Sequence, residues 1–366
     1  MTNRTKVNSK VTKMLKSMMP TASQNHICVL SMMVVGIVLG KNAQLSQISL
    51  QIPSKSKPAS IEKQCHRFVK NKHIDAQHFY LPFAQHILAH LGKKITVIMD
   101  ASQVGRGCMT LMVAVVYKKR AIPLTWIVYK GKKGHASAER HIEVLALLKA
   151  IVPAETELTL LGDGEYDTVD MLNWVKNVEN WVYIVRSGSN IILSDKEKTY
   201  PFSTLVLGKN RKNGVRNVTF TKCEDAPIVT AIAWWDDPYK SPIFLISNSK
   251  KKVKKICKLY RQRYKIETIF SDQKSRGFNI HKSHLHHPER VNRLLLTTSI
   301  AYIWLLYLGV EIAQDETRRR LIDRTDRRDK SLFRLGLDWF IYTMTNELDI
   351  HVLFAPPDLI KIRGVR

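Results

Sequence analysis

The spacing of hydrophobic positions changes along the chain, and each change marks a predicted structural unit. Residues 1–90 carry short apolar patches broken by Gly40, Pro53 and Pro58, and the polar positions between them are mostly basic. Gly and Pro are strong punctuators of local structure, so this pattern predicts several helices of modest length rather than one long element. We therefore expect a helical N-terminal region.

Residues 45–71 of that region have the rhythm of a helix, a turn and a second, basic helix. This arrangement fits a helix-turn-helix that reads DNA. It fits an ordinary helical cap packed on the next unit equally well.

After Gly92 the pattern changes to β-branched, strand-like runs. The predicted elements are strands at 95–100, 108–117 and 121–129, a helix at 135–152, a strand at 157–163, a helix at 168–177 and a strand at 181–187. The first three strands are expected to form an antiparallel meander, and helix, strand, helix and strand follow. This is the order of an α/β ribonuclease H-like core with a mixed sheet. In such a sheet the first and fourth strands are neighbours.

The rest of the chain divides into three further parts. Residues 188–250 contain short β patterns separated by turn residues, which predicts a mostly β insertion. Residues 251–313 complete the core, with a buried helix at 290–313, and residues 314–366 form a basic C-terminal region. Together with 1–90 and 91–187, these ranges are the expected organisation.

Charge narrows the class of partner. The chain has 58 Lys and Arg against 31 Asp and Glu, a formal net charge of +27, which favours nucleic acid or an anionic membrane. The apolar run 294–310 is short for a membrane span and contains Thr and Ser, and the run 27–39 lacks a signal-peptide cleavage pattern. We expect no membrane association. Five scattered cysteines predict neither zinc nor disulfides, and indicate a reducing cytoplasm.

Three acidic residues stand out as candidates for chemistry. Asp100 and Asp163 end predicted strands that should be neighbours, and Glu267 lies on a late helix. Acids also end strands simply as turn formers. Three carboxylates could hold two Mg²⁺ or Mn²⁺ ions for an in-line phosphoryl transfer. The acids Asp163, Glu165 and Asp167 could suggest a calcium loop, but the Gly and final Glu of an EF-hand are missing.

Residues 260–274 contain no Pro or Gly, which predicts one continuous helix. On such a helix Tyr260, Arg263, Glu267 and Lys274 share a stripe only about 60° wide. A carboxylate beside Arg, Lys and Tyr suits a face that holds a metal and grips phosphates. For this helix alone, a solvated charged face with i,i+4 ion pairs is the favoured explanation. The two upstream aspartates at strand ends and the large positive charge shift the preference to the functional one.

This spacing, Y-x2-R-x3-E-x6-K, resembles the signature of the insertion-sequence-four family of bacterial DDE transposases. VIMDAS around Asp100, LLGDGEYD around Asp163 and the 103 residues between Asp163 and Glu267 fit the layout of that family. The resemblance covers roughly residues 90–310. It implies a ribonuclease H-like core with a β insertion, and cut-and-paste DNA transposition of an insertion sequence by two-metal phosphoryl transfer through a hairpin intermediate.

The resemblance also implies roles for individual residues. Two Mg²⁺ ions, or Mn²⁺ in their place, would be bound by Asp100, Asp163 and Glu267. Tyr260, Arg263 and Lys274 would contact the phosphates near a terminal nucleotide and the flipped base. Trp235 (or Trp234) would stack on that base. Arg186 would contact the DNA backbone. A buried core Trp and a solvent-exposed Arg are the ordinary alternatives for these last positions.

The implied partners are double-stranded DNA, as transposon terminal inverted repeats and as target, and a second copy of the chain in a homodimer on DNA. The expected location is the bacterial cytoplasm, with the nucleoid. Alternatives from other classes are an inactive DNA-binding descendant, a ribonuclease H-like nuclease and a membrane-associated basic protein. The histidines at 281, 284, 286 and 287 predict a polar turn rather than a zinc site, and the arginines at 318–320 predict nonspecific phosphate contacts.

Overall fold

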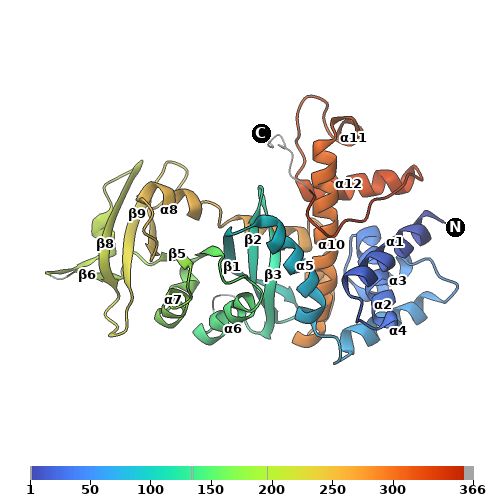
Figure 1. The fold of residues 1–366 in the computed structure, drawn as a ribbon, viewed down its shortest axis with the longest axis horizontal. Helices are drawn as coiled ribbons and strands as arrows, with labels where there is room; N and C mark the ends of the chain where they lie inside the picture. Colours follow the sequence, from blue (N-terminus) through green and yellow to red (C-terminus); the bar gives the residue numbers. More distant parts are fainter. Residues whose placement is uncertain (1, 133, 135, 196, 358–366) are drawn as a thin grey trace.

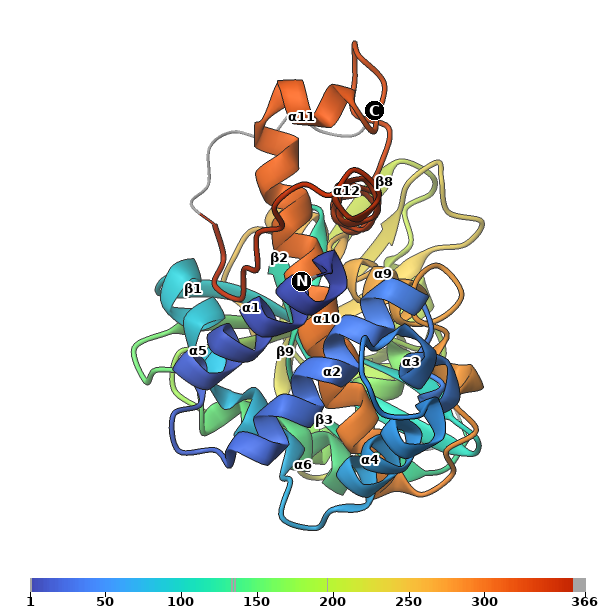
Figure 2. The same ribbon diagram turned by 90° about the vertical axis from the view of Figure 1, so that its right-hand side faces the viewer.

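Five helices form the N-terminal region of the computed structural model, which describes residues 2–357 except 133, 135 and 196. These helices are α1 (Asn3–Met18), α2 (Gln24–Gly40), α3 (Leu45–Gln51), α4 (Pro58–Lys70) and α5 (Ala76–Leu91). They pack around the long helix α10 (Pro288–Gln314) at one end of the molecule (Figures 1 and 2). The predicted helical N-terminal region is therefore present. Residues 358–366, the end of the expected C-terminal region, lie outside the described part.

The centre of the molecule is a mixed sheet. Its first five strands and two helices are β1 (Lys94–Gly105), β2 (Cys108–Tyr117), β3 (Arg120–Lys130), α6 (Ala138–Lys149), β4 (Glu157–Gly162), α7 (Val169–Lys176) and β5 (Trp181–Ser187). Their order is β3-β2-β1-β4-β5. β1 pairs antiparallel with β2 and parallel with β4, which is parallel to β5. This is the ribonuclease H-like order expected from the sequence, with the first and fourth strands adjacent.

Strand β1 is longer than predicted. The sequence predicted a strand that ends at Asp100, but β1 continues to Gly105. The extra residues pair with β2, from Asp100 opposite Met112 to Gly105 opposite Cys108, so the hairpin with β2 extends the strand after its contact with β4 has ended. Asp100 is therefore held on one side by the sheet and open on the other.

The segment 188–250 extends the central sheet instead of forming a separate one. Its elements are β6 (Ile192–Ser194), β7 (Thr199–Pro201), the 3₁₀ helix η2 (Phe202–Leu205), β8 (Arg211–Phe220), β9 (Ile228–Trp235) and β10 (Ile243–Ser247). Strand β10 pairs antiparallel with β5, and the order continues β10-β9-β8-β6-β7. The free edge of β5 is thereby covered, and the β-rich segment projects to the opposite end from α1–α4 (Figure 1).

The chain after residue 250 supplies the helices that pack on the sheet and on α10. They are α8 (Val253–Tyr260), α9 (Lys265–Gln273), the 3₁₀ helix η3 (Ile280–Lys282), α10, α11 (Glu316–Arg320) and α12 (Leu332–Thr345). Helix α10 is long and apolar enough to cross a membrane, but 94% of its apolar window is buried inside the molecule. Helices α2 and α3 together are also long and apolar enough for a span, but the chain bends by 90° between them. The burial of α10 is that of a core helix.

The predicted continuous helix over 260–274 is wrong, because it breaks at residues 261–264 into α8 and α9. After the break, the buried Lys265 donates from its ammonium group to the carbonyl of Lys118 (2.7 Å) and to the side-chain carbonyl of Gln262 (3.1 Å). These bonds tie the start of α9 to the β2–β3 turn. Tertiary contacts thus override a local sequence that favours uninterrupted helix.

Helices α10 and α12 cross in direct backbone contact. A Cβ placed on Gly309 would lie 1.8 Å from the carbonyl oxygen of Leu332, and one on Gly336 would lie 1.8 Å from that of Leu305. Only glycine at both positions permits this approach, so the two residues set the distance between the helices.

We expect Gly336→Ala to lower the free energy of unfolding by about 3 kcal/mol, since backbone rather than a flexible side chain must move. Urea denaturation would measure the loss. Gly164→Ala is the matched control, because its Cβ meets nothing within 4 Å. Equal stability of the two variants would contradict the close crossing.

Candidate active site

Parallel pairing of β1 with β4 determines where the two aspartates lie. The last paired residues are Ile98 and Leu161, and Asp100 and Asp163 each follow two positions later. Each carboxylate accepts a hydrogen bond from the next backbone N–H, that of Ala101 at 2.8 Å or of Gly164 at 2.9 Å. The aspartates therefore leave the sheet side by side, as the strand order predicted.

Helix α9 brings the third acid to the same place. Asp100, Asp163 and Glu267 line one cavity of about 290 Å³, together with Arg263. The side chain of Asp100 is 14% exposed, that of Asp163 is 38% exposed and that of Glu267 is 56% exposed. The three predicted acids thus share one solvent-accessible cavity.

Arg263 contacts all three carboxylates from the turn between α8 and α9. Its guanidinium lies 2.8 Å from Glu267, 3.8 Å from Asp100 and 3.8 Å from Asp163. Burial acts to lower the pKa of Arg263, but the carboxylates, Asp163 first, together with Tyr260 raise it above its usual value. This arginine therefore stays positively charged within the acid cluster.

The other residues of the predicted helical face are also near the acids. Tyr260, the last residue of α8, is buried, and burial together with Asp163 raises the pKa of its hydroxyl. Lys274 is the C-cap of α9, and its ammonium donates to the hydroxyl of Ser102 at 2.6 Å. Ser102 follows Asp100 by two residues, so both lie on the same face of β1. The sequence analysis missed Ser102, although alternation along the strand was a usable signal.

A second cavity adjoins the first. It has a volume of about 260 Å³, and its lining includes Arg186, Arg263 and three tyrosines, Tyr239, Tyr260 and Tyr264. Arg186 lies in β5 with its guanidinium 3.8 Å from Asp163. Tyr264 is 52% exposed. Tyr239 and Tyr264 belong to no sequence motif, so their place at this site could not be predicted from the sequence.

The structure does not bring the predicted tryptophan to the acids. Trp235 is absent from the described residues that line the two cavities. Its indole N–H donates to the carbonyl of Tyr239 at 3.0 Å, so the ring supports the loop that carries Tyr239. Trp234 is buried, with the guanidinium of Arg261 5.1 Å from its ring centre.

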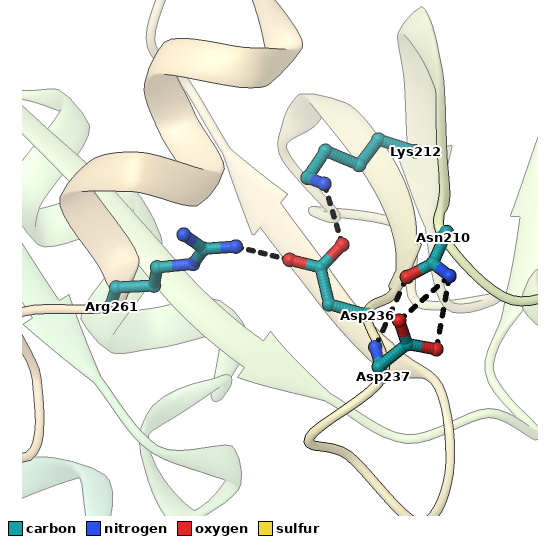
Figure 3. A network of polar contacts seen from close by, with 5 residues as sticks. All are labelled: Asn210, Lys212, Asp236, Asp237 and Arg261. Carbon is teal, nitrogen blue, oxygen red and sulfur yellow. Dashed lines mark hydrogen bonds and ion pairs between the residues drawn. The ribbon is translucent and has the colours of Figure 1, made fainter.

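A polar network holds this loop against the start of the α8–α9 turn (Figure 3). The carboxylate of Asp236 accepts from Lys212 of β8 at 2.6 Å and is also paired with Arg261. Next to it, Asn210 and Asp237 bond each other through side-chain and backbone groups. The network joins the β-rich segment to the residues that flank Arg263.

The donor set suits a hard divalent cation, because carboxylate oxygens are its preferred ligands. A further carboxylate, Glu165, lines the same cavity, and it was not assigned a role from the sequence. Within residues 2–357, leaving out 133, 135 and 196, no three carboxylate, His or Cys side chains are close enough to hold a metal ion as they stand. The chemistry of these carboxylates fits such an ion, but binding would require both movement of the Arg263 guanidinium away from them and a closer approach of the acids to one another.

Comparison with known proteins agrees with this geometry. The transposase DDE domain family matches residues 73–304, well over half of the sequence, and the chain belongs to this family. It is accordingly a transposase, of the class that carries out DNA transposition and recombination. A cryo-EM structure of the piggyBac transposase synaptic complex with hairpin DNA is similar at 11% identity and a TM-score of 0.46, over 95% of this chain and 80% of that one. No curated protein matches.

Behind the aspartates, the ring of His141 packs edge-on against Tyr166, with centroids 4.9 Å apart. The imidazole is fully buried, and neither of its nitrogens has a hydrogen-bond partner in the described part of the chain. Burial lowers the pKa of His141 to about 4, although Glu139 acts in the opposite direction. The fold therefore holds this histidine neutral.

A lowered histidine pKa makes stability depend on pH in a defined direction. Below pH 6.5 the unfolded chain takes up a proton that the folded protein excludes until about pH 4. Stability should fall through this window by on the order of 3 kcal/mol in total. His141→Phe should lose this component, which urea denaturation at pH 7 and pH 5 would measure. The same pH difference in wild type and variant would contradict it.

Proposed function

We propose that this protein is a DDE transposase of the insertion-sequence-four type, which cuts and joins double-stranded DNA at the ends of an insertion sequence. The observation that carries the proposal is the single cavity that collects Asp100, Asp163 and Glu267 from three separate elements. A basic aromatic cavity adjoins it. Metal-dependent phosphoryl transfer is the chemistry for which such an arrangement is suited.

In the proposed mechanism the three carboxylates hold two divalent ions, Mg²⁺ or Mn²⁺ in its place. When bound, these ions activate the attacking water or 3′ hydroxyl and stabilise the leaving oxygen. Lys274, positioned beside Asp100 by its bond to Ser102, contributes a positive charge at the scissile phosphate. Arg186, next to Asp163, contacts the DNA backbone.

The second cavity is suited to a nucleotide displaced from the duplex. Formation of a hairpin strains the DNA backbone, and a base swung out of the stack is stabilised by an aromatic surface and by cations at its phosphates. Tyr264 is more than half exposed in this cavity, beside Arg186, Lys240 and Arg261. In this proposal Tyr264 stacks on the base, and Trp235 supports the Tyr239 loop behind it.

Helix α4 supplies a surface for the terminal inverted repeats. Its apolar side, which includes Ile61, Cys65 and Phe68, is buried, whereas Lys63 and Arg67 are exposed. The exposed lysines of the preceding turn, Lys55 and Lys57, extend the positive surface. A short helix, a turn and a basic helix fit the major groove of DNA. Helix α4 also packs on α10, so it caps the core and presents a DNA-binding face at once.

The remaining partners follow from the reaction. Both ends of the element must be cut and joined together, so the active form is a homodimer on DNA, which also engages target DNA. The working location is the cytoplasm, at the nucleoid, without a membrane. The DNA cleavage experiment also separates this proposal from an inactive DNA-binding descendant, which binds without cutting, and from a nuclease, which cuts without strand transfer.

Asp100→Asn, Asp163→Asn and Glu267→Gln should each reduce cleavage by at least about a hundredfold, since each removes a charged ion ligand. The substrate is DNA carrying the ends that flank the gene, with Mg²⁺, Mn²⁺ or EDTA, resolved on a denaturing gel. Wild type should give 3′ nicks, hairpins and joined products only with metal. Asp170→Asn, on the exposed side of α7, is the control and should cut normally. Retained cleavage by any of the three variants would remove that residue from the site.

The double variant Lys63→Ala/Arg67→Ala should bind end DNA about tenfold more weakly and reduce the salt slope by about 2, one for each lost phosphate contact. Fluorescence anisotropy across a salt series would measure both. Lys149→Ala/Lys176→Ala makes the same charge change on α6 and α7 and should leave both values unchanged. Equal losses in the two double variants would show general charge attraction instead of binding through α4.

A further inference from the structure

Arg263 is the residue that the two cavities share, and it is also the residue that all three acids contact. We propose that Arg263 is an exchangeable counter-ion: it holds the acid cluster when metal is absent, and it releases the carboxylates when a DNA phosphate binds its guanidinium. Metal loading would thereby be coupled to DNA binding. The inference rests on the proposed two-metal function and adds the order in which the site is assembled.

Arg263 and a bound metal ion would compete for the same carboxylates. The guanidinium lies 2.8 Å from Oε1 of Glu267 and 3.8 Å from Oδ2 of both Asp100 and Asp163. A Mg²⁺ ion needs carboxylate oxygens at about 2.0–2.1 Å in near-octahedral geometry. A dication bound among these carboxylates would lie beside the guanidinium, and the two like charges repel each other. Ion binding therefore requires Arg263 to withdraw.

The second cavity gives the guanidinium a place to go. Arg263 lies in the turn between α8 and α9, where the backbone is held by short-range bonds such as Arg263 N–H to the Tyr260 carbonyl at 2.9 Å. The Arg263 side chain already lines both cavities, so rotation about its side-chain torsions would move the guanidinium from the acids toward this cavity. Arg186, Lys240 and Arg261 already line that space. Arg186 and Arg261 are each paired with a carboxylate, Asp163 and Asp236, on one side only. Together with Lys240 they still give this cavity a positive lining that attracts a DNA phosphate.

Charge in the acid cluster gives the coupling its direction. Four carboxylates line the cavity, those of Asp100, Asp163, Glu267 and Glu165. The cations near them are Arg263, Arg186 and Lys274, so the cluster is short of positive charge even without DNA. Removal of Arg263 leaves the carboxylates repelling one another and makes them stronger ligands for a cation. Because coupling between two ligands is reciprocal, metal should also tighten DNA binding in wild type.

The experiment measures Mn²⁺ binding by electron paramagnetic resonance, without DNA and with a pre-cleaved end duplex. Without DNA, Arg263→Gln should bind Mn²⁺ at least about fivefold more tightly than wild type, at the lower end of common coupling factors. Addition of the duplex should tighten Mn²⁺ binding in wild type and have a smaller effect in the variant. Arg263→Lys, which keeps one charge but contacts fewer oxygens, should be intermediate.

Arg334→Gln is the matched control, because Arg334 pairs with Asp338 at 2.9 Å across the same i,i+4 spacing, on α12. It should bind Mn²⁺ as wild type does. Thermal unfolding adds a second readout. Without metal, Arg263→Gln should unfold at a lower temperature than wild type, and Mn²⁺ should raise its unfolding temperature by more than it raises that of wild type.

Unchanged or weaker Mn²⁺ binding by Arg263→Gln without DNA would overturn the counter-ion role. The proposed function would stand in that case, provided that wild type with DNA binds Mn²⁺ in a manner lost in Asp100→Asn. If no protein binds Mn²⁺ through Asp100, the metal site itself is absent and both proposals fall.

Discussion

Parallel pairing of β1 with β4 is the constraint on which the site depends. The register places Asp100 and Asp163 two residues beyond the last paired positions, so the backbone fixes where both side chains begin. Helix α9 completes the set because Lys265 ties its first turn to the β2–β3 turn, and this places Glu267 opposite the aspartates. Backbone geometry thus assembles three like charges that repel one another.

Such an assembly needs compensation, and the chain provides it in two ways. Arg263 lies among the carboxylates, and Arg186 lies beside Asp163. The fold beneath is stiff: α10 is buried along nearly its whole length and is crossed by α12 in glycine-to-backbone contact. A rigid frame around a mobile counter-ion is compatible with a site that stays folded without metal and binds metal when DNA arrives.

The sequence predicted those features that depend on order and alternation. Strand order brought Asp100 beside Asp163, and the spacing of Tyr260, Arg263, Glu267 and Lys274 identified the face that meets them. Features that depend on contacts between residues far apart in the chain could not be predicted from the sequence. The extension of β1 depends on β2, the break at 261–264 depends on the carbonyl of Lys118, and the continuation of the sheet into β10 depends on the open edge of β5. Tyr239 and Tyr264 approach the site only through that folding, so their place in the second cavity could not be predicted from the sequence.

The most direct test of the central claim is anomalous diffraction from crystals of the protein with Mn²⁺ and a pre-cleaved DNA end. The account predicts manganese peaks within bonding distance of Asp100, Asp163 and Glu267, with the guanidinium of Arg263 withdrawn from them and in contact with a DNA phosphate. Manganese bound elsewhere, or Arg263 still bridging the three carboxylates beside bound DNA, would contradict it.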